Sequence, residues 1–177
     1  MSNPNIPSGF KPLKSPFSKG QPVANEHDLH ASNSEIFIGS PVSIVAGGVD
    51  LATAGTDNAL IGISAEYKAA SSGGKIKVYD DPEQRFSAQT DDGTGVATAL
   101  GAVGLNINFI GSGGSGLRST AELDESSADV TLGHQFTILE LEKSFHRTAK
   151  NAFGEFNRLV VKINDHQGRS DTGVTGI

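Results

Sequence analysis

Two pairs of neighbouring aspartates come nearest to a catalytic or metal-binding pattern in this sequence. Asp80 and Asp81 precede a proline, and Asp91 and Asp92 precede a glycine. Paired carboxylates act as acid and base in glycoside hydrolysis and acid proteolysis, and carboxylate oxygens also hold divalent cations. Each pair adjoins a turn-forming residue, however, and aspartate in such a place accepts hydrogen bonds from the next backbone amides. We therefore expect the four aspartates to shape turns, with a cation site and catalysis as the alternatives.

The five histidines are scattered, and only His27 and His30 are close enough in sequence to share a local site. With Glu26 and Asp28 they offer imidazole and carboxylate groups at short spacing, as a weak metal site requires. A third ligand of known geometry is missing, so a solvated polar hinge is the simpler interpretation. The absence of cysteine excludes disulfides, thiol nucleophiles and iron–sulfur clusters. We expect neither a metal nor a cofactor.

The glycine-rich segment 111–116 fits the G-x-G-x-x-G spacing of a dinucleotide-binding loop, but its surroundings do not. That fingerprint needs a helix within a parallel β-α-β unit, whereas the flanking residues have the pattern of antiparallel strands. No Lys-Ser or Lys-Thr pair follows the last glycine, and no serine has the spacing of a nucleophile elbow. The sequence predicts a flexible loop here, and it gives no positive argument for an enzyme.

Apolar residues alternate with polar or small ones from residue 35 onward, which predicts half-buried strands separated by turns. The alternating positions are Ile36 and Ile38, Ile61 and Ile63, Ile76 and Val78, Phe86 and Ala88, Leu105, Ile107 and Phe109, and Leu159, Val161 and Ile163. We predict an all-β domain over residues 34–177, mainly an antiparallel sandwich or barrel, with one or two short helices around 96–103 and 117–127. The alternation slips by one residue within 136–141, which predicts a β-bulge.

The first 33 residues differ from the rest in composition and charge. Five of the 7 prolines lie within the first 22 residues, and this segment has a net charge of +1 whereas the remainder carries −7. Proline fixes φ and removes a backbone donor, so we predict an extended arm. A disordered terminus and an arm docked on another chain both fit this pattern, and we favour docking. Three apolar side chains would then anchor the arm, and three lysines would pair with acidic groups of the partner. These residues are Phe10, Leu13 and Phe17, and Lys11, Lys14 and Lys19.

The net charge of −6 argues against nucleic acid as the main partner, because that binding depends on basic surfaces that displace counterions. No run of about 18 to 20 apolar residues is present to span a bilayer. The first residues are interrupted by prolines and lack the pattern of a secretion signal. We expect a soluble protein that binds neither nucleic acid nor a membrane.

Residues 77–89 read KVYDDPEQRFSAQ, which resembles the head decoration, or capsid cement, proteins of tailed bacteriophages. In that family a V-x-D-D-P segment leads into a strand carrying F-x-x-Q. Further segments agree in order: IFIGSPV at 36–42, GLRS at 116–119, ELD at 122–124 and LVVKIN at 159–164. Together they cover roughly residues 35–165, and none is a catalytic motif.

The resemblance implies a β-rich structural protein on the outer surface of an icosahedral virion. It would bridge neighbouring major capsid protein subunits and contact other copies of itself as a dimer or trimer. An arm and a body that each make a modest contact suit this role, because linking them raises the effective concentration of the second contact. The main alternative is a carbohydrate- or receptor-binding β module, although the chain has no tryptophan and only 2 tyrosines as sugar platforms. A hydrolase with dispersed catalytic residues is the third interpretation.

Overall fold

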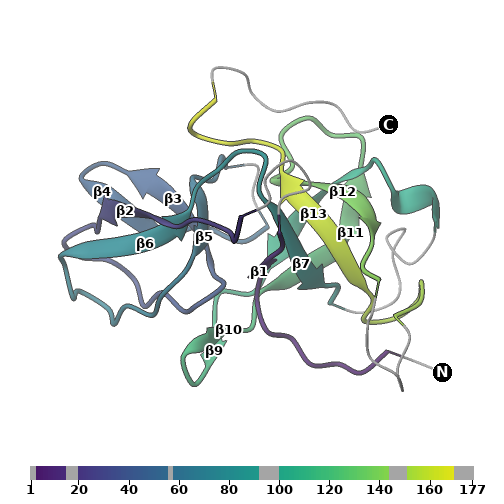
Figure 1. Ribbon diagram of the computed structural model, residues 1–177, viewed down its shortest axis with the longest axis horizontal. Helices are drawn as coiled ribbons and strands as arrows, with labels where there is room; N and C mark the ends of the chain where they lie inside the picture. Colours follow the sequence, from purple (N-terminus) through teal and green to yellow (C-terminus); the bar gives the residue numbers. More distant parts are fainter. Residues whose placement is uncertain (1–2, 15–19, 56–57, 92–99, 144–150, 170–177) are drawn as a thin grey trace.

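The computed structural model describes residues 3–14, 20–55, 58–91, 100–143 and 151–169, which form two antiparallel sheets and a short hairpin (Figure 1). One sheet has six strands, in the order β1 (Lys11–Pro12), β7 (Arg85–Gln89), β13 (Arg158–Ile163), β12 (Phe136–Leu141), β8 (Asn106–Ile110) and β11 (Glu122–Asp129). The other has five, in the order β2 (Asn25–Asp28), β6 (Lys75–Tyr79), β5 (Gly62–Ser64), β3 (Pro41–Val45) and β4 (Gly48–Leu51). The hairpin pairs β9 (Gly114–Ser115) with β10 (Arg118–Ser119). The predicted all-β antiparallel class is confirmed.

Each sheet curls until strands at or near its two ends meet. Thr90, which directly follows β7, forms an isolated parallel bridge with Leu123 of β11. In the other sheet Leu29, which directly follows β2, forms the same kind of bridge with Val49 of β4. The five-stranded sheet occupies the left half of Figure 1 and the six-stranded sheet the right half. The curling gives partners to strand edges that would otherwise present unpaired backbone groups.

The core consists of two apolar clusters, and the alternating residues of the sequence supply 12 of their 24 buried members, 8 of 17 in the larger and 4 of 7 in the smaller. The larger cluster lies within the six-stranded sheet and also includes Ile63 of β5. In the six-stranded sheet Phe86 and Ala88 of β7 point inward, as do Leu159 and Val161 of β13. The five-stranded sheet encloses a smaller cluster formed by Leu29, Ile36, Val42, Val49, Ile61, Ile76 and Val78. The period-two pattern therefore identified the core-facing side chains of these strands correctly.

The helix expected around residues 117–127 is wrong, because this segment forms β10 and β11. Burial in β11 alternates from Leu123 to Glu125, and the Glu125 side chain is 0% exposed. This glutamate occupies a core-facing position and interrupts the alternation of apolar and polar residues by which a strand is predicted. Of the other expected helix, residues 96–99 lie outside the described residues, and Leu100–Ala102 forms a single 3₁₀ turn. The bulge predicted within 136–141 is confirmed by a register shift between Ile138 and Glu140.

The described residues do not form the separate N-terminal arm that the sequence predicts, because residues 11–12 and 25–28 are strands of the two sheets. β1 pairs with β7, with Lys11 opposite Ser87, and β2 pairs with β6, with His27 opposite Ile76. Both are edge strands of their ladders, the position to which proline confines this segment. The change in composition at residue 33 therefore does not mark a boundary between arm and body in the described residues.

A close backbone contact joins the N-terminal residues to the connection from β2 to β3 in the five-stranded sheet. The amide of Phe10 donates to the carbonyl of Gly39 at 3.0 Å, and the amide of Ser119 donates to the carbonyl of Ile38 at 2.9 Å. Gly9 has a φ of +65°, and a Cβ there would lie 2.8 Å from the Gly39 oxygen. Only glycine permits this conformation and this distance together.

Candidate interaction surface of the N-terminal segment

Phe10 lies in the core of the six-stranded sheet and not on the surface. Its side chain is 1% exposed. The ring stacks on Phe136 with centroids 4.6 Å apart, and it meets Phe109 edge to face at 6.4 Å. A ring enclosed in this way makes no contact with another chain, so the expectation that Phe10 anchors an arm on a partner is wrong. Phe10 instead anchors residues 3–14, the N-terminal segment, on the protein's own sheet.

Polar contacts fasten the beginning of the N-terminal segment. The side chain of Asn3 donates to two carbonyls of the chain just before β13, both at 2.9 Å. The amide of Ile6 donates to Oε1 of Gln89 at 3.1 Å, and the guanidinium of Arg158 donates to the carbonyl of Ile6 at 3.1 Å. The segment is therefore held by side chains of β7 and β13 on one side and by its own asparagine on the other.

Leu13 is half-buried and is held through its backbone. Its amide donates to the carbonyl of Arg85 at 2.8 Å, and its carbonyl accepts a hydrogen bond from Nε2 of Gln84 at 2.6 Å. Lys11 and Lys14 are exposed. The two remaining residues expected to bind a partner, Phe17 and Lys19, lie outside the described residues.

Lys11 projects from the same face of the sheet as Arg158. Lys11 lies opposite Ser87 in the β1–β7 ladder, and Ser87 lies opposite Val160 in the β7–β13 ladder. Arg158 is two residues before Val160 on the same strand, and side chains two residues apart share a face. The register thus brings together two cations that the sequence separates widely.

Arg118 joins this group from the hairpin. It forms an isolated parallel bridge with Ile38, and the next residue, Gly39, accepts the amide of Phe10. β10 also lies directly beside the N-terminal segment, because a Cβ at Gly9 would lie 2.8 Å from Cβ of Ser119. Within the described part of the chain, neither Lys11 nor Arg118 forms an ion pair.

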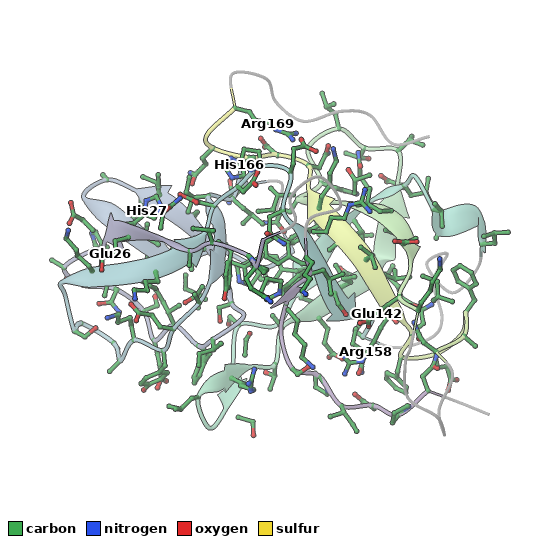
Figure 2. The ribbon with its side chains drawn as sticks, in the orientation of Figure 1. Glu26, His27, Glu142, Arg158, His166 and Arg169 are labelled. Atoms are coloured by element: carbon green, nitrogen blue, oxygen red, sulfur yellow. The ribbon has the colours of Figure 1, made fainter. Side chains whose placement is uncertain are left out.

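The electrostatics of Lys11 reflect these neighbours. Although Lys11 reaches solvent, its partial burial, followed by the positive charges of Arg158 and Arg118, lowers the pKa of Lys11 below its usual value, and the carboxylate of Glu142 opposes the shift. Glu142 and Arg158 lie at the same end of the sheet in Figure 2, and the amide of Glu142 donates to the Arg158 carbonyl at 2.9 Å. Three cations and one carboxylate therefore share this surface.

Asp81 forms the turn that the sequence predicts. Its Oδ1 accepts the amide of Glu83 at 2.9 Å, and its carbonyl accepts the amide of Gln84 at 2.9 Å. These are the bonds of an aspartate that closes a turn on the following residues. The turn lies in the connection from β6 to β7, which passes from one sheet to the other.

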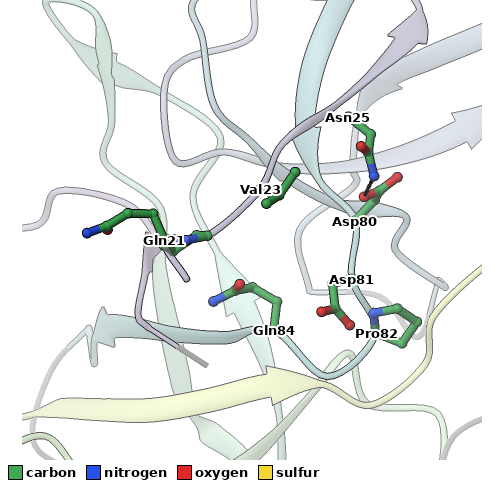
Figure 3. A pocket seen from close by; sticks show the side chains of 8 residues that line it. Gln21, Val23, Asn25, Asp80, Asp81, Pro82 and Gln84 are labelled. Carbon is green, nitrogen blue, oxygen red and sulfur yellow. Dashed lines mark hydrogen bonds between the residues drawn. The ribbon is translucent and has the colours of Figure 1, made fainter. Parts of the chain in front are cut away.

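Asp80 faces the opposite way and binds β2. Its Oδ1 accepts a hydrogen bond from Nδ2 of Asn25 at 2.8 Å, and its Oδ2 lies 2.8 Å from Nε2 of His27. The two neighbouring carboxylates thus serve different elements and do not form an acid–base pair. A pocket of about 500 Å³ lies beside them (Figure 3). Its lining residues are Gln21, Pro22, Val23, Asn25, Asp80, Asp81, Pro82 and Gln84.

Asp91 is bound to β11, and the residues of the turn expected after it lie outside the described residues. Its Oδ1 accepts the amide of Glu125 at 3.1 Å, and its own amide donates to the carbonyl of Leu123 at 3.0 Å. Both bonds cross to β11, so Asp91 fastens the place where the six-stranded sheet meets itself. Asp92 lies outside the described residues.

Sequence reasoning missed a second carboxylate at this place. Glu122, at the start of β11, accepts a hydrogen bond from Nε2 of Gln89 at 3.2 Å. Burial, and then the negative charge of Asp91, raises the pKa of Glu122 to about 7. Glu122 and Asp91 are far apart in sequence, so no local spacing could have indicated the pair. Gln89 links them to the N-terminal segment, because it also donates to Oδ1 of Asn5 at 3.1 Å.

The remaining sequence candidates do not converge on a ligand. On β2 the side chains of Glu26 and Asp28 lie on the face opposite to His27, and Glu26 pairs with Lys75 at 3.7 Å. Among the described residues, no group of three or more His, Asp or Glu side chains is placed to hold a metal ion. None of the described segments forms a helix with the length and hydrophobicity to cross a membrane. The glycine-rich residues 111–116 lead into and form the hairpin.

Comparisons of the chain with protein-family models, with curated proteins and with solved structures found no match.

Proposed function

We propose that the protein decorates and cements the outer surface of an icosahedral phage capsid, where it bridges neighbouring major capsid protein subunits. The observation that carries the proposal is the part played by the segment that resembles decoration proteins, residues 77–89. Asp80 ties this segment to β2, Asp81 closes its turn, and Phe86 fills the core. Gln89 holds the N-terminal segment. Every one of these side chains joins parts of the fold, as expected of a structural protein.

The arrangement of the first residues gives further support. The N-terminal segment is fastened to the six-stranded sheet, and β2 belongs to the five-stranded sheet. The same stretch of chain therefore ties two curled sheets together. A body whose two parts are tied in this way can contact two neighbouring subunits at once, and each contact then strengthens the other.

The alternative of a sugar-binding module gains no support from the pocket. Its lining contains no aromatic side chain, and sugar rings usually stack on aromatic platforms. The carboxylates that line it already accept hydrogen bonds from Asn25 and from the backbone. We therefore retain the structural role as the conclusion.

Co-sedimentation with empty shells of the source virus tests this function. The full chain is mixed with expanded and with unexpanded shells, and the bound fraction is measured against concentration. We expect saturable binding to expanded shells, a stoichiometry that follows the shell symmetry, and a higher melting temperature of the decorated shell. Binding to neither kind of shell would contradict the proposal, and a glycan array would then test the binding-module alternative.

A further inference from the structure

We propose that Lys11, Arg118 and Arg158 form a basic face by which the protein docks on an acidic segment of a partner protein. This inference rests on the proposed function, under which the partner is the shell protein, and it names the chemistry of the contact. The basic face replaces the expected arm anchors, because the side chain of Phe10 is buried in the core and does not reach the surface. It retains Lys11 and adds two arginines that come from distant parts of the chain.

The charges on the basic face are not balanced within the described residues. Lys11 and Arg118 form no ion pair there, and the guanidinium of Arg158 donates to the carbonyl of Ile6. The nearby carboxylate is Glu142, whose Oε2 accepts a hydrogen bond from Oγ of Ser87 at 2.7 Å. Bringing like charges together costs free energy, and carboxylates of a partner would relieve that repulsion. The unbalanced cations stand out in a chain whose net charge is −6.

Exposed apolar side chains flank the basic face and favour a protein partner over nucleic acid. Ile6, next to Arg158, is 60% exposed, and Leu117, next to Arg118, is 58% exposed. Protein interfaces combine apolar side chains at their centre with arginine and a polar rim. A phosphate backbone would use the cations but would gain little from the apolar side chains.

The basic face is also held in place before any partner arrives. β1 is paired with β7, and the chain next to Arg118 is fixed by the bond between Ser119 and Ile38. Gly9 and Gly39 bring these two parts of the chain together at backbone distance. Cations on a fixed backbone lose less conformational entropy on binding than cations on a free arm, which favours affinity.

The experiment compares two double variants that each remove two positive charges. K11Q/R118Q changes the basic face but leaves the bond between Arg158 and Ile6 in place. K75Q/K77Q is the matched control, because Lys75 and Lys77 are exposed on β6 of the other sheet. Binding of a poly-glutamate peptide and of an oligonucleotide is measured by titration, and binding to expanded shells by co-sedimentation. Thermal unfolding checks that each variant folds, and R118Q alone is used if the double variant does not.

We expect K11Q/R118Q to weaken poly-glutamate and shell binding roughly tenfold, and the control to bind as the wild type does. Equal losses in both variants, or no loss in K11Q/R118Q, would overturn the basic face. Failure of the wild type to bind poly-glutamate would also overturn it, as would tighter binding of the oligonucleotide through the same residues. If wild type binds poly-glutamate through these residues but binds no shell, the proposed function fails while the basic face stands. If wild type binds the shell and K11Q/R118Q binds it equally well, the function stands and the basic face fails.

Discussion

The ring of Phe10 stacks on the ring of Phe136, with 4.6 Å between the centroids and 13° between the ring planes. Phe136 belongs to β12, in the middle of the six-stranded sheet, while Phe10 directly precedes the edge strand β1. A proline-rich terminus thus reaches into the centre of the core. The N-terminal segment is consequently part of the folding unit, and its removal should affect stability as well as any partner contact.

Replacing Phe10 by alanine should lower the free energy of unfolding by about 3 to 5 kcal/mol, because it removes a buried ring and leaves a cavity. Urea unfolding followed by circular dichroism measures the change. Ile6→Ala is the matched control, since Ile6 lies in the same segment but is 60% exposed, and its effect should stay within about 0.5 kcal/mol. Equal effects of the two substitutions would mean that the ring is not packed in the core in solution.

The sequence predicted the strands wherever one face is apolar, as around Phe86 and Leu159. It failed where a polar side chain takes a core-facing place, because Glu125 interrupts the alternation that identifies β11. It also failed at the N-terminus for a physical reason. Proline content excludes helices and central strands, but it does not distinguish an edge strand of the same chain from an arm lying on another. The direction of Phe10 depends on a tertiary contact that its spacing does not encode.

Gly9→Ala should destabilise the protein more than Gly73→Ala. Gly9 has a φ of +65° and Gly73 a φ of +61°. Alanine is strained in this left-handed conformation, so both substitutions should lower the free energy of unfolding by about 1 kcal/mol. Only at Gly9 does the new Cβ meet another chain segment, the Gly39 oxygen at 2.8 Å, whereas Gly73 faces open space. We expect an additional loss of about 1 to 3 kcal/mol at Gly9, measured by urea unfolding. Equal losses would show that the two chain segments do not pack at this distance.

Glu122 should make stability depend on pH. Its pKa in the folded protein is raised to about 7 from a usual value of 4.5, so the fold favours the protonated form. The contribution of Glu122 to stability is therefore fully present below about pH 4.5 and is lost as the pH rises through about 7. Glu122→Gln, which keeps an acceptor for Gln89, should flatten the stability profile over this interval and make the variant more stable than the wild type at pH 8.

The measurement for Glu122 is the unfolding midpoint in urea at several pH values between 4 and 8. Glu140→Gln is the control, because Glu140 is an exposed carboxylate on β12. It should leave the difference between low and high pH as it is in the wild type. If stability depends on pH in Glu122→Gln as strongly as in the wild type, another group is responsible for the pH dependence.

The candidate surface was only partly predictable, and the reason is sequence distance. Lys11 was found because it belongs to a local run of lysines and apolar residues. Arg118 and Arg158 were not, since strand register and a hairpin bring them to Lys11. Glu122 and Asp91 meet for the same reason, at the place where the sheet closes on itself. Turn chemistry is local, so the part played by Asp81 could be read from its neighbours.

A substitution of Asp81 distinguishes a structural role in the turn from a cation site. Asp81→Ala removes the acceptor for the amide of Glu83 and should lower stability by about 1 kcal/mol, because that amide then loses its bond at the turn. Thermal unfolding of the wild type and of the variant is measured with calcium and with a chelator. A turn predicts the same loss under both conditions, since only backbone hydrogen bonding changes. A melting temperature that rises with calcium in the wild type but not in Asp81→Ala would instead show that the carboxylate binds the ion, and the turn would then be secondary to that site.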